Sequence, residues 1–228
     1  QYIFKCFDFF LKLSKSKKII GLINCPVVKE TLFKKKHQGV TEYLAKKSKK
    51  ENNEVMLIYN EKLAISPITT HIDLKEVSKK INKIKIIKKI KTINNFYKRV
   101  FNKSPNFAVL GLNPHNFYKS NKSREKKLIN DAIKLLKKSN IKVHGPISPD
   151  SSFIFYKRNK FDVIIGMYHD QVLSPFKALF NYDAINITLG LPYVRISPDH
   201  GVAYDMVGKN KANPLSLIKA IKFFNFIK

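Results

Sequence analysis

Short apolar runs alternate with amphipathic segments along the chain and predict strands alternating with helices. Apolar runs bounded by polar or turn residues are typical of buried strands, and they occupy residues 19–24, 54–59, 63–68, 107–112, 141–143 and 161–166. Helical periodicity predicts helices at residues 2–15, 30–36, 41–48, 74–100, 125–138 and 214–226. This alternation is typical of an α/β fold with a largely parallel sheet.

Local signals refine three of these segments. Residues 74–100 alternate apolar positions with lysines, and Asn94-Asn95 is a candidate break within that helical region. Gly145-Pro146 is expected to form a turn after the strand at 141–143. One face of the last helix gathers the large apolar side chains Leu215, Ile218, Ile221 and Phe224.

The composition indicates a globular protein. The chain has 228 residues, of which 44% are hydrophobic, and its apolar runs are shorter than a membrane span. Charged residues interrupt segment 2–13, which therefore favours a helix over a signal peptide. Cys6 and Cys25 are expected to be small buried residues in a reducing cytoplasm. Because the chain begins with Gln1, we expect a fragment or a processed product.

The formal net charge of +28 has two possible explanations. A polyanionic partner, such as nucleic acid or an acidic membrane, is one of them. The other is a drift of codons toward A and T, since lysine, isoleucine, asparagine and phenylalanine abound while tryptophan is absent. Nucleic-acid readers favour arginine, which occurs only at Arg99, Arg124, Arg158 and Arg195. We favour the compositional explanation, and expect no membrane or nucleic-acid partner.

A dense group of polar residues follows the predicted strand at 161–166. The residues directly after it are Tyr168, His169, Asp170 and Gln171. This is the carboxyl end of a strand, where open α/β sheets usually bind ligands. Lys177, Asn186 and Arg195 follow at intervals and are groups suited to an anionic ligand. Residues 197–214 are rich in turn residues, which let a ligand approach the backbone. The whole stretch predicts a binding site.

Three predicted strands end in a histidine within a few residues. The histidines are His71 in ISPITTHIDL, His115 in AVLGLNPHN and His169 in VIIGMYHDQ. Parallel strands bring their carboxyl ends to the same edge of a sheet, so these imidazoles could meet around one point. Three neutral imidazoles suit Zn²⁺ and similar divalent ions, and leave a position open for substrate. The strand order decides whether they meet.

Several motifs together resemble the 4-hydroxythreonine-4-phosphate dehydrogenase family of pyridoxal phosphate biosynthesis. They are TTHIDL, GLNPH, GPISPDSSF, FDVIIGMYHDQ, NITLGLPYVRISPDHG and AYDMVGKNKANP. The last of them, with the HGV before it, is also similar to the nucleotide loop of the isocitrate and isopropylmalate dehydrogenases. The resemblance implies their two-domain α/β/α architecture with a truncated first domain. Residues 1–35 and 200–228 would be the remnant of that domain with the cofactor loop, and residues 36–199 the second domain with the metal and substrate residues.

The resemblance also implies an activity and its residues. The reaction is the NAD- or NADP-dependent oxidation of 4-phosphooxy-L-threonine, followed by decarboxylation to 3-amino-2-oxopropyl phosphate, in a cytoplasmic homodimer. A divalent ion (Zn, Mg or Co) would be held across the dimer interface by His71, His115 and His169. The substrate would contact Thr41, Lys177, Asn186 and Arg195. The cofactor would lie near His200, Gly201 and Asn213. Candidates for orienting a metal-bound histidine or relaying a proton are Asp150 and Asp170.

The chain departs from the family pattern at several positions. The family's glycine-rich GDPAGIGPE-type segment is missing, and Val40 replaces a substrate-binding histidine. After His115, residues with side chains replace a glycine-rich run at Phe117, Lys119, Ser120 and Ser123. Two alternatives therefore stay open: a related dehydrogenase of another phosphorylated hydroxy acid, or an eroded inactive remnant.

Overall fold

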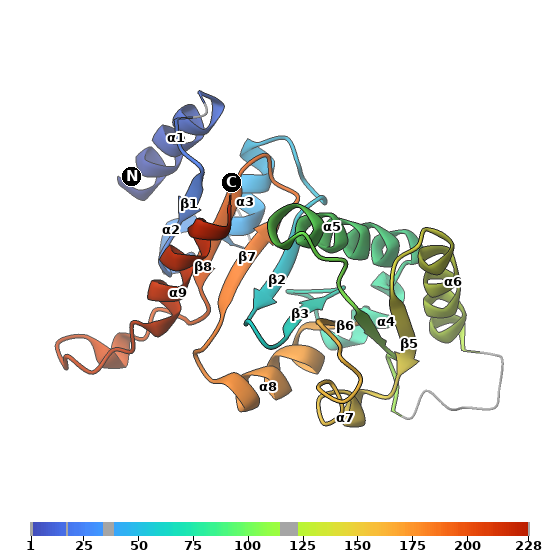
Figure 1. The fold of residues 1–228 in the computed structure, drawn as a ribbon. Helices are drawn as coiled ribbons and strands as arrows, with labels where there is room; N and C mark the ends of the chain where they lie inside the picture. Colours follow the sequence, from blue (N-terminus) through green and yellow to red (C-terminus); the bar gives the residue numbers. More distant parts are fainter. Residues whose placement is uncertain (1, 17, 34–38, 115–122, 228) are drawn as a thin grey trace. The chain divides into compact units, whose positions relative to one another are not determined.

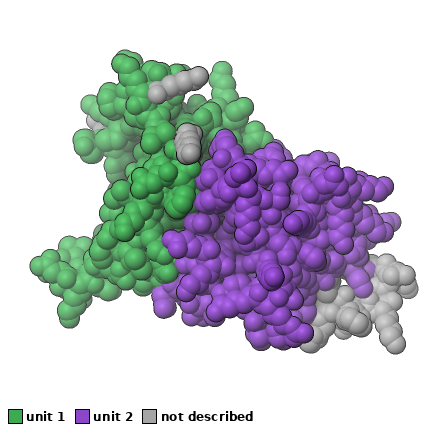
Figure 2. All heavy atoms as spheres, viewed as in Figure 1, with its two compact units in different colours: residues 1–56, 182–228 green, residues 57–181 purple. Residues whose placement is uncertain are grey.

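The chain forms two compact units, which Figure 2 shows in different colours. The computed structural model describes residues 2–16, 18–33, 39–114 and 123–227. Unit 1 comprises residues 1–56 and 182–228, and unit 2 comprises residues 57–181. These boundaries follow spatial contacts. The domain division expected from the resemblance, at 35–36 and 199–200, stays a prediction.

Unit 1 is built on three strands in the order β1-β8-β7. β1 (Gly21–Ile23) is parallel to β8 (Val194–Pro198), which is antiparallel to β7 (Ile185–Leu189). The helices of this unit are α1 (Tyr2–Lys15), α2 (Lys29–Phe33), α3 (Val40–Lys47) and α9 (Leu215–Phe223), with 3₁₀ turns η2 (Tyr204–Met206) and η3 (Phe224–Phe226). Helix α9 packs on β7 and β8. Residues from α1, α2 and α3 form an apolar core cluster of Phe7, Phe33, Val40, Tyr43 and Leu44.

Unit 2 holds the strand order β2-β3-β6-β4-β5. The strands are β2 (Val55–Tyr59), which begins at the end of unit 1, β3 (Ala64–Pro67), β6 (Val163–Gly166), β4 (Phe107–Leu110) and β5 (Val143–Ile147). β2 is antiparallel to β3, and the pairings from β3 to β5 are parallel. Every residue of β3, β4 and β6 is buried, as expected for parallel strands covered on both faces.

The helices of unit 2 cover this sheet. They are η1 (Leu74–Glu76), α4 (Val77–Lys80), α5 (Lys83–Phe101), α6 (Arg124–Lys138), α7 (Pro149–Ser152) and α8 (His169–Phe180). Helix α8 packs on β3 and β6, while α6 packs against α5 and β5. Figure 1 shows α5 and α8 on opposite sides of the strands. The α/β prediction is therefore confirmed. β2 and β7 are the antiparallel exceptions to the largely parallel sheet.

The long helical region of the sequence breaks at a different place from the one predicted. The break lies at Ile81 and Asn82, between α4 and α5, whereas Asn94 is buried inside α5. The Asn82 side chain accepts hydrogen bonds from the backbone N–H groups of Ile84 and Lys85. Asparagine is a preferred N-cap because it satisfies these N–H groups, and so α5 begins here.

Three other local expectations were wrong. Gly145-Pro146 lies inside β5, where the register against β4 shifts, rather than in a turn. Cys6 and Cys25 are exposed. Helix α9 exposes Leu215, Ile218 and Ile221, and buries Ser216, Ala220 and Phe223 instead. The Ser216 hydroxyl donates to the Ala184 carbonyl and accepts from the Asp199 N–H, so α9 approaches β7 through small side chains. No helix within the described ranges is long and apolar enough to cross a membrane.

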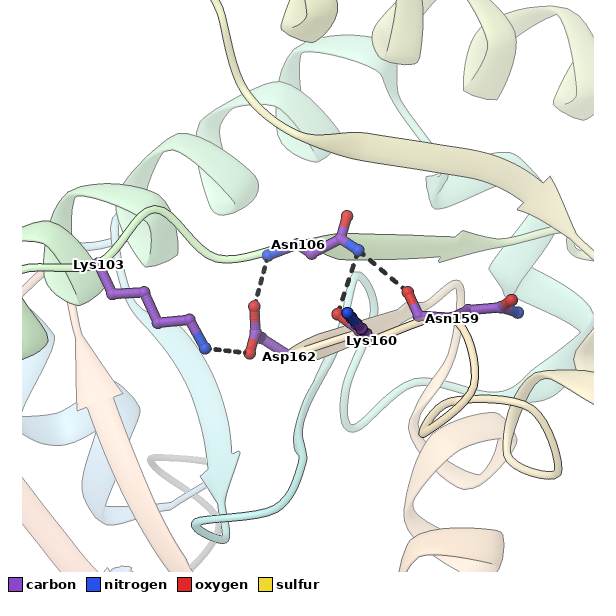
Figure 3. A network of polar contacts seen from close by, with 5 residues as sticks. All are labelled: Lys103, Asn106, Asn159, Lys160 and Asp162. Carbon is purple, nitrogen blue, oxygen red and sulfur yellow. Dashed lines mark hydrogen bonds and ion pairs between the residues drawn. The ribbon is translucent and has the colours of Figure 1, made fainter.

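A polar network joins the amino ends of β4 and β6 (Figure 3). The Asp162 carboxylate accepts from the Asn106 N–H at 2.8 Å and pairs with the exposed Lys103 ammonium. The Asn106 side-chain amide donates to the backbone carbonyls of Asn159 and Lys160. The network therefore fixes the loop that precedes β6 against the residue that precedes β4.

Replacing Asp162 by Ala should lower the free energy of unfolding by about 1–3 kcal/mol, because the half-buried Asn106 N–H then loses its acceptor. Lys103→Ala removes only the exposed partner and should cost at most about 1 kcal/mol. Urea unfolding of both variants measures the difference. Equal losses would show that the ion pair, and not the backbone contact, is what stabilises this end of the sheet.

Candidate functional site

The three strands that precede the candidate metal ligands are neighbours in the sheet. β6 lies between β3 and β4 and is parallel to both. Their carboxyl ends, Pro67, Gly166 and Leu110, therefore meet at one edge. His71 and His169 follow β3 and β6 within four residues. The sequence pattern did not determine the strand order. In the observed order β3-β6-β4, the loops that follow the three strands begin at the same edge of the sheet.

The His71 and His169 rings lie side by side at that edge. Their centroids are 5.9 Å apart with an interplanar angle of 39°. Two imidazoles that share one tetrahedral ion have centroids roughly 5 Å apart, given metal–nitrogen bonds of about 2.0–2.1 Å. The observed spacing is slightly longer, so a small movement of the rings would let them share an ion. His169 Nδ1 is 2.6 Å from an Asp170 carboxylate oxygen, which leaves Nε2 as the ring nitrogen available for a metal.

The other residues predicted around this edge are placed as follows. His115 lies outside the described residues, and within the described part of the chain no three His, Cys, Asp or Glu side chains form a metal-binding group. Asp150 is exposed at the start of α7 and accepts a hydrogen bond from the Ser148 hydroxyl at 2.6 Å. Lys177 is half-buried on α8 of unit 2. Asp170 contacts the candidate ligand His169 directly.

Arg195 is the centre of a buried polar cluster in unit 1. Its side chain lies on β8 and is only 4% exposed. Nε donates to Asn24 Oδ1 at 2.6 Å, and Nη1 donates to Thr188 Oγ1 at 2.9 Å and to Thr41 Oγ1 at 3.3 Å. Burial lowers the pKa of the guanidinium to about 10, and the negative charge of Glu42 acts in the opposite direction. Hydrogen bonds to neutral side-chain oxygens and the negative charge of Glu42 therefore stabilise the charged guanidinium.

The register of β7 and β8 places Asn186 on the same face as Arg195. Thr188 is opposite Arg195, and Asn186 is opposite Ser197, so alternate residues of both strands share this face. The Asn186 Oδ1 atom is buried and has no hydrogen-bond partner among the described residues. A buried amide oxygen without a partner carries a desolvation penalty. The structure therefore brings Thr41, Asn186 and Arg195 to one polar face of unit 1.

Two departures from the family pattern have a local explanation in the structure. Val40, which replaces a histidine, is 6% exposed and packs in the core cluster with Tyr43 and Leu44. Ser123, which replaces a glycine, has a φ of −74° and caps α6 by accepting from the Lys126 N–H. The other replaced glycine positions, Phe117, Lys119 and Ser120, lie outside the described residues.

The predicted cofactor segment is an exposed connection between β8 and α9. Residues 201–214 are exposed throughout, and a Cβ added at Gly201 would meet no atom within 4 Å. His200 Nδ1 is 2.9 Å from the Gly201 carbonyl, and the Asn213 side chain accepts from the Leu215 N–H at the start of α9. These contacts are local, so the segment offers exposed backbone to a ligand.

Four residues with contacts in these clusters were not assigned a role from the sequence. They are Asn24 and Thr188 around Arg195, and Thr69 and Gln171 at the strand ends of unit 2. Asn24 follows β1 directly, just as polar residues follow β6, and this signal could have identified it. The polar alternation of Asn186 and Thr188 in β7 is a second such signal.

Comparison with known proteins shows extensive similarity to named dehydrogenases. The chain is 43% identical over 216 residues to the 4-hydroxythreonine-4-phosphate dehydrogenase of Sulfurihydrogenibium sp. (strain YO3AOP1), covering 93% of this chain and 66% of that protein. It is 32% identical to the D-threonate 4-phosphate dehydrogenase of Pectobacterium atrosepticum, covering 96% of this chain and 68% of that protein. The chain thus spans about two thirds of the length of these curated relatives.

Solved structures agree with the fold. The 4-hydroxythreonine-4-phosphate dehydrogenase of Klebsiella pneumoniae superposes with a TM-score of 0.82 at 31% identity, over 99% of this chain and 70% of that chain. Isocitrate dehydrogenase of Methylococcus capsulatus, at 14% identity, has a TM-score of 0.57 over 90% of this chain and 68% of that one, and confirms the predicted fold relationship alone. The family model of pyridoxal phosphate biosynthetic protein PdxA matches residues 1–224. The chain belongs to the PdxA family.

Proposed function

We propose that this chain carries the metal and substrate residues of an NAD(P)-dependent dehydrogenase that oxidises 4-phosphooxy-L-threonine. The observation that supports this most strongly is the meeting of β3, β6 and β4 at one sheet edge, with His71 and His169 side by side. In a chain of this family, two adjacent strand-end imidazoles favour a metal site over an isolated structural pair.

His71, His169 and His115 would hold the divalent ion of such a site. Their neutral nitrogens suit Zn²⁺ or Co²⁺ better than Mg²⁺, which prefers oxygen ligands. Asp170 would fix the His169 ring through Nδ1. A bound divalent ion supplies Lewis acidity, which lowers the pKa of a substrate hydroxyl and stabilises the oxyanion. Following the resemblance, we propose that the ligands come from both subunits of a homodimer.

Arg195, Thr41 and Asn186 of unit 1 would bind an anionic group of the substrate. Arg195 is already desolvated in unit 1, and its hydrogen-bond partners among the described residues are neutral. A phosphate or carboxylate would add the charge-assisted contact that this buried guanidinium favours. The Asn186 amide would bind the same ligand. Holding the anionic group in place helps to orient the carbon–hydrogen bond of the substrate for transfer.

The proposed reaction then balances as an oxidation followed by loss of CO₂. The substrate hydroxyl gives up a proton and its carbon gives a hydride to NAD(P)⁺, for which the exposed segment from His200 and Gly201 to Asn213 is the proposed neighbour. The product is a β-keto acid, which loses CO₂ to give 3-amino-2-oxopropyl phosphate. Asp150 and Asp170 remain the candidates for relaying the proton.

A second substrate of the same class is a specific alternative. The relative from Pectobacterium atrosepticum is named for D-threonate 4-phosphate, which also joins a phosphate to a hydroxy acid. Val40 packs in the core instead of supplying a polar contact beside Thr41, so the chain has one polar side chain fewer at this position than the family pattern. This difference would alter the choice between a substrate with an amino group and one with a hydroxyl in its place.

The enzyme assignment predicts NADH or NADPH formation from 4-phosphooxy-L-threonine in the presence of Zn²⁺ or Co²⁺. His169→Ala should lower kcat/KM by at least about 100-fold, because it removes a metal ligand. His144→Ala, at an exposed position on β5, is the matched control and should stay within about twofold of the unchanged chain. A higher kcat/KM for D-threonate 4-phosphate would assign that substrate instead. A folded chain that neither binds metal nor oxidises either substrate would support the inactive remnant.

Replacing Asp170 and replacing Asp150 should have different effects on metal affinity. Asp170→Asn should weaken Zn²⁺ binding by about tenfold, since its carboxylate holds the His169 ring. Asp150→Asn should leave Zn²⁺ affinity unchanged, because Asp150 is exposed at the start of α7, where it accepts a hydrogen bond from Ser148. Competition with a chromophoric chelator measures both. If Asp170→Asn keeps full affinity but shifts the pH–rate profile, Asp170 relays a proton instead.

Inorganic phosphate should raise the melting temperature of the unchanged chain through Arg195. At a concentration of 100 times its Kd, a ligand that binds only the folded state stabilises it by about 2.7 kcal/mol. Arg195→Met should abolish this shift, whereas Arg158→Met, at an exposed position outside the cluster, should keep it. Differential scanning calorimetry with a phosphate titration measures the shift. An equal shift in both variants would place the anion elsewhere.

A further inference from the structure

The hydrogen-bond ladder of unit 2 continues beyond the ends of β3 and β6. The Ile68 N–H donates to the Gly166 carbonyl at 2.8 Å, and the Thr69 N–H donates to the Met167 carbonyl at 3.1 Å. The buried Thr69 hydroxyl donates to the same Met167 carbonyl at 2.7 Å. Two donors therefore hold the residue at which the chain leaves β6.

Gln171 extends this ladder from β6 to β4 with its side-chain amide. Its Oε1 accepts from the Met167 N–H at 2.6 Å, and its Nε2 donates to the Gly111 carbonyl at 2.8 Å. The Gly111 N–H in turn donates to the Ile147 carbonyl at the end of β5, at 2.9 Å. One amide thus joins two strand ends whose backbones no longer pair directly.

Each residue held by this ladder is followed closely by a candidate site residue. Thr69 is two residues before His71, Met167 is two before His169, Gly111 is four before His115, and Ile147 is three before Asp150. The positions of the His71 and His169 loops therefore depend on how firmly these strand ends are joined.

The sequence around Gln171 allows it to take this position. Gln171 is the third residue of α8, and its side chain folds back to a backbone N–H before the helix, as in a capping box. Gly166 leaves the room that this requires: a Cβ there would lie 2.5 Å from Val172 Cγ1 and 3.2 Å from Gln171 Oε1. An amide side chain supplies the acceptor and the donor that the two strand ends need from two separate atoms.

We propose that Gln171 is a positioning residue that fixes the loop carrying His169 by joining the ends of β6 and β4. The proposal rests on the proposed function, because it requires that His169 binds the proposed metal ion. A residue that only stabilises the fold would change unfolding but would leave the affinity of the folded protein for metal unaltered.

Asn106 provides a matched control. Its side-chain amide also joins the flanks of β4 and β6, but at their amino ends, where it donates to the carbonyls of Asn159 and Lys160 (Figure 3). Gln171 and Asn106 are both half-buried. Loss of either amide removes inter-loop hydrogen bonds from the same sheet, but only Gln171 lies at the edge that carries His169.

The test compares Gln171→Met with Asn106→Leu in the whole chain. Zn²⁺ affinity is measured by chelator competition, the ligand field by the visible spectrum of bound Co²⁺, and stability by thermal unfolding. We expect both variants to lower the melting temperature. Gln171→Met should weaken Zn²⁺ binding by about tenfold and alter the Co²⁺ spectrum, because the loop that carries His169 then loses its connection to the end of β4. Asn106→Leu should change neither.

The outcomes separate the two proposals. If the unchanged chain binds neither Zn²⁺ nor Co²⁺, the proposed metal site itself is wrong. If it binds them and Gln171→Met binds them equally well with the same spectrum, only the positioning role is wrong. Should Gln171→Met not fold, Gln171→Asn takes its place. Its amide is one methylene too short to join both strand ends, and it should still weaken Zn²⁺ binding at least threefold; unaltered affinity would overturn the proposal.

Discussion

Backbone N–H and carbonyl groups at the ends of parallel strands still need hydrogen-bond partners. In this protein, the bonds that supply those partners lie at the sheet edge that carries the candidate metal ligands. Buried N–H and carbonyl groups without a partner are costly, and β3, β6 and β4 end within a few residues of one another in the sheet. Thr69 satisfies the Met167 carbonyl, and Gln171 satisfies the Met167 N–H and the Gly111 carbonyl. The same bonds that remove this cost also fix the loops that lead to the histidines.

Unit 1 solves a different problem, the burial of a charge. Arg195 is almost fully buried, and desolvation is the largest influence on its pKa. Asn24, Thr188 and Thr41 satisfy some of its N–H groups but supply no negative charge. A buried guanidinium with neutral partners is expensive to maintain, and Asn186 beside it leaves an amide oxygen unsatisfied. Both features fit a site that an anionic ligand completes.

The sequence predicted most of the fold because periodicity depends on local burial. α1 was predicted at its observed bounds, and β2, β3, β4 and β6 lie inside the predicted apolar runs. The misses have tertiary causes. The apolar face of α9 was identified, but close packing of Ser216 against Ala184 turned a different face inward. The helix break depended on the Asn82 cap, and Asn94 proved to be buried inside α5.

Residue types and their positions after predicted strands were enough to name the candidate site residues, but not to show which of them lie together. The histidines after the strands and the polar residues of β7 are visible in the sequence, whereas the strand order that brings β3, β6 and β4 together is a long-range property. Asn24 and Gln171 act through hydrogen bonds to residues 60 or more positions away in the sequence. Thr188 contacts Arg195 across an antiparallel strand pair. Local patterns mark Asn24 and Thr188 as candidates, but they do not contain the contacts that give these residues their roles.

The central claim is that strand-end imidazoles share one metal ion. Crystals grown with Zn²⁺ and measured at the zinc absorption edge test this most directly. The account predicts an anomalous difference peak between the rings of His71 and His169, with His115 as a further nitrogen ligand. A well-phased map with no peak between these rings, or with the zinc bound at other residues, would contradict it.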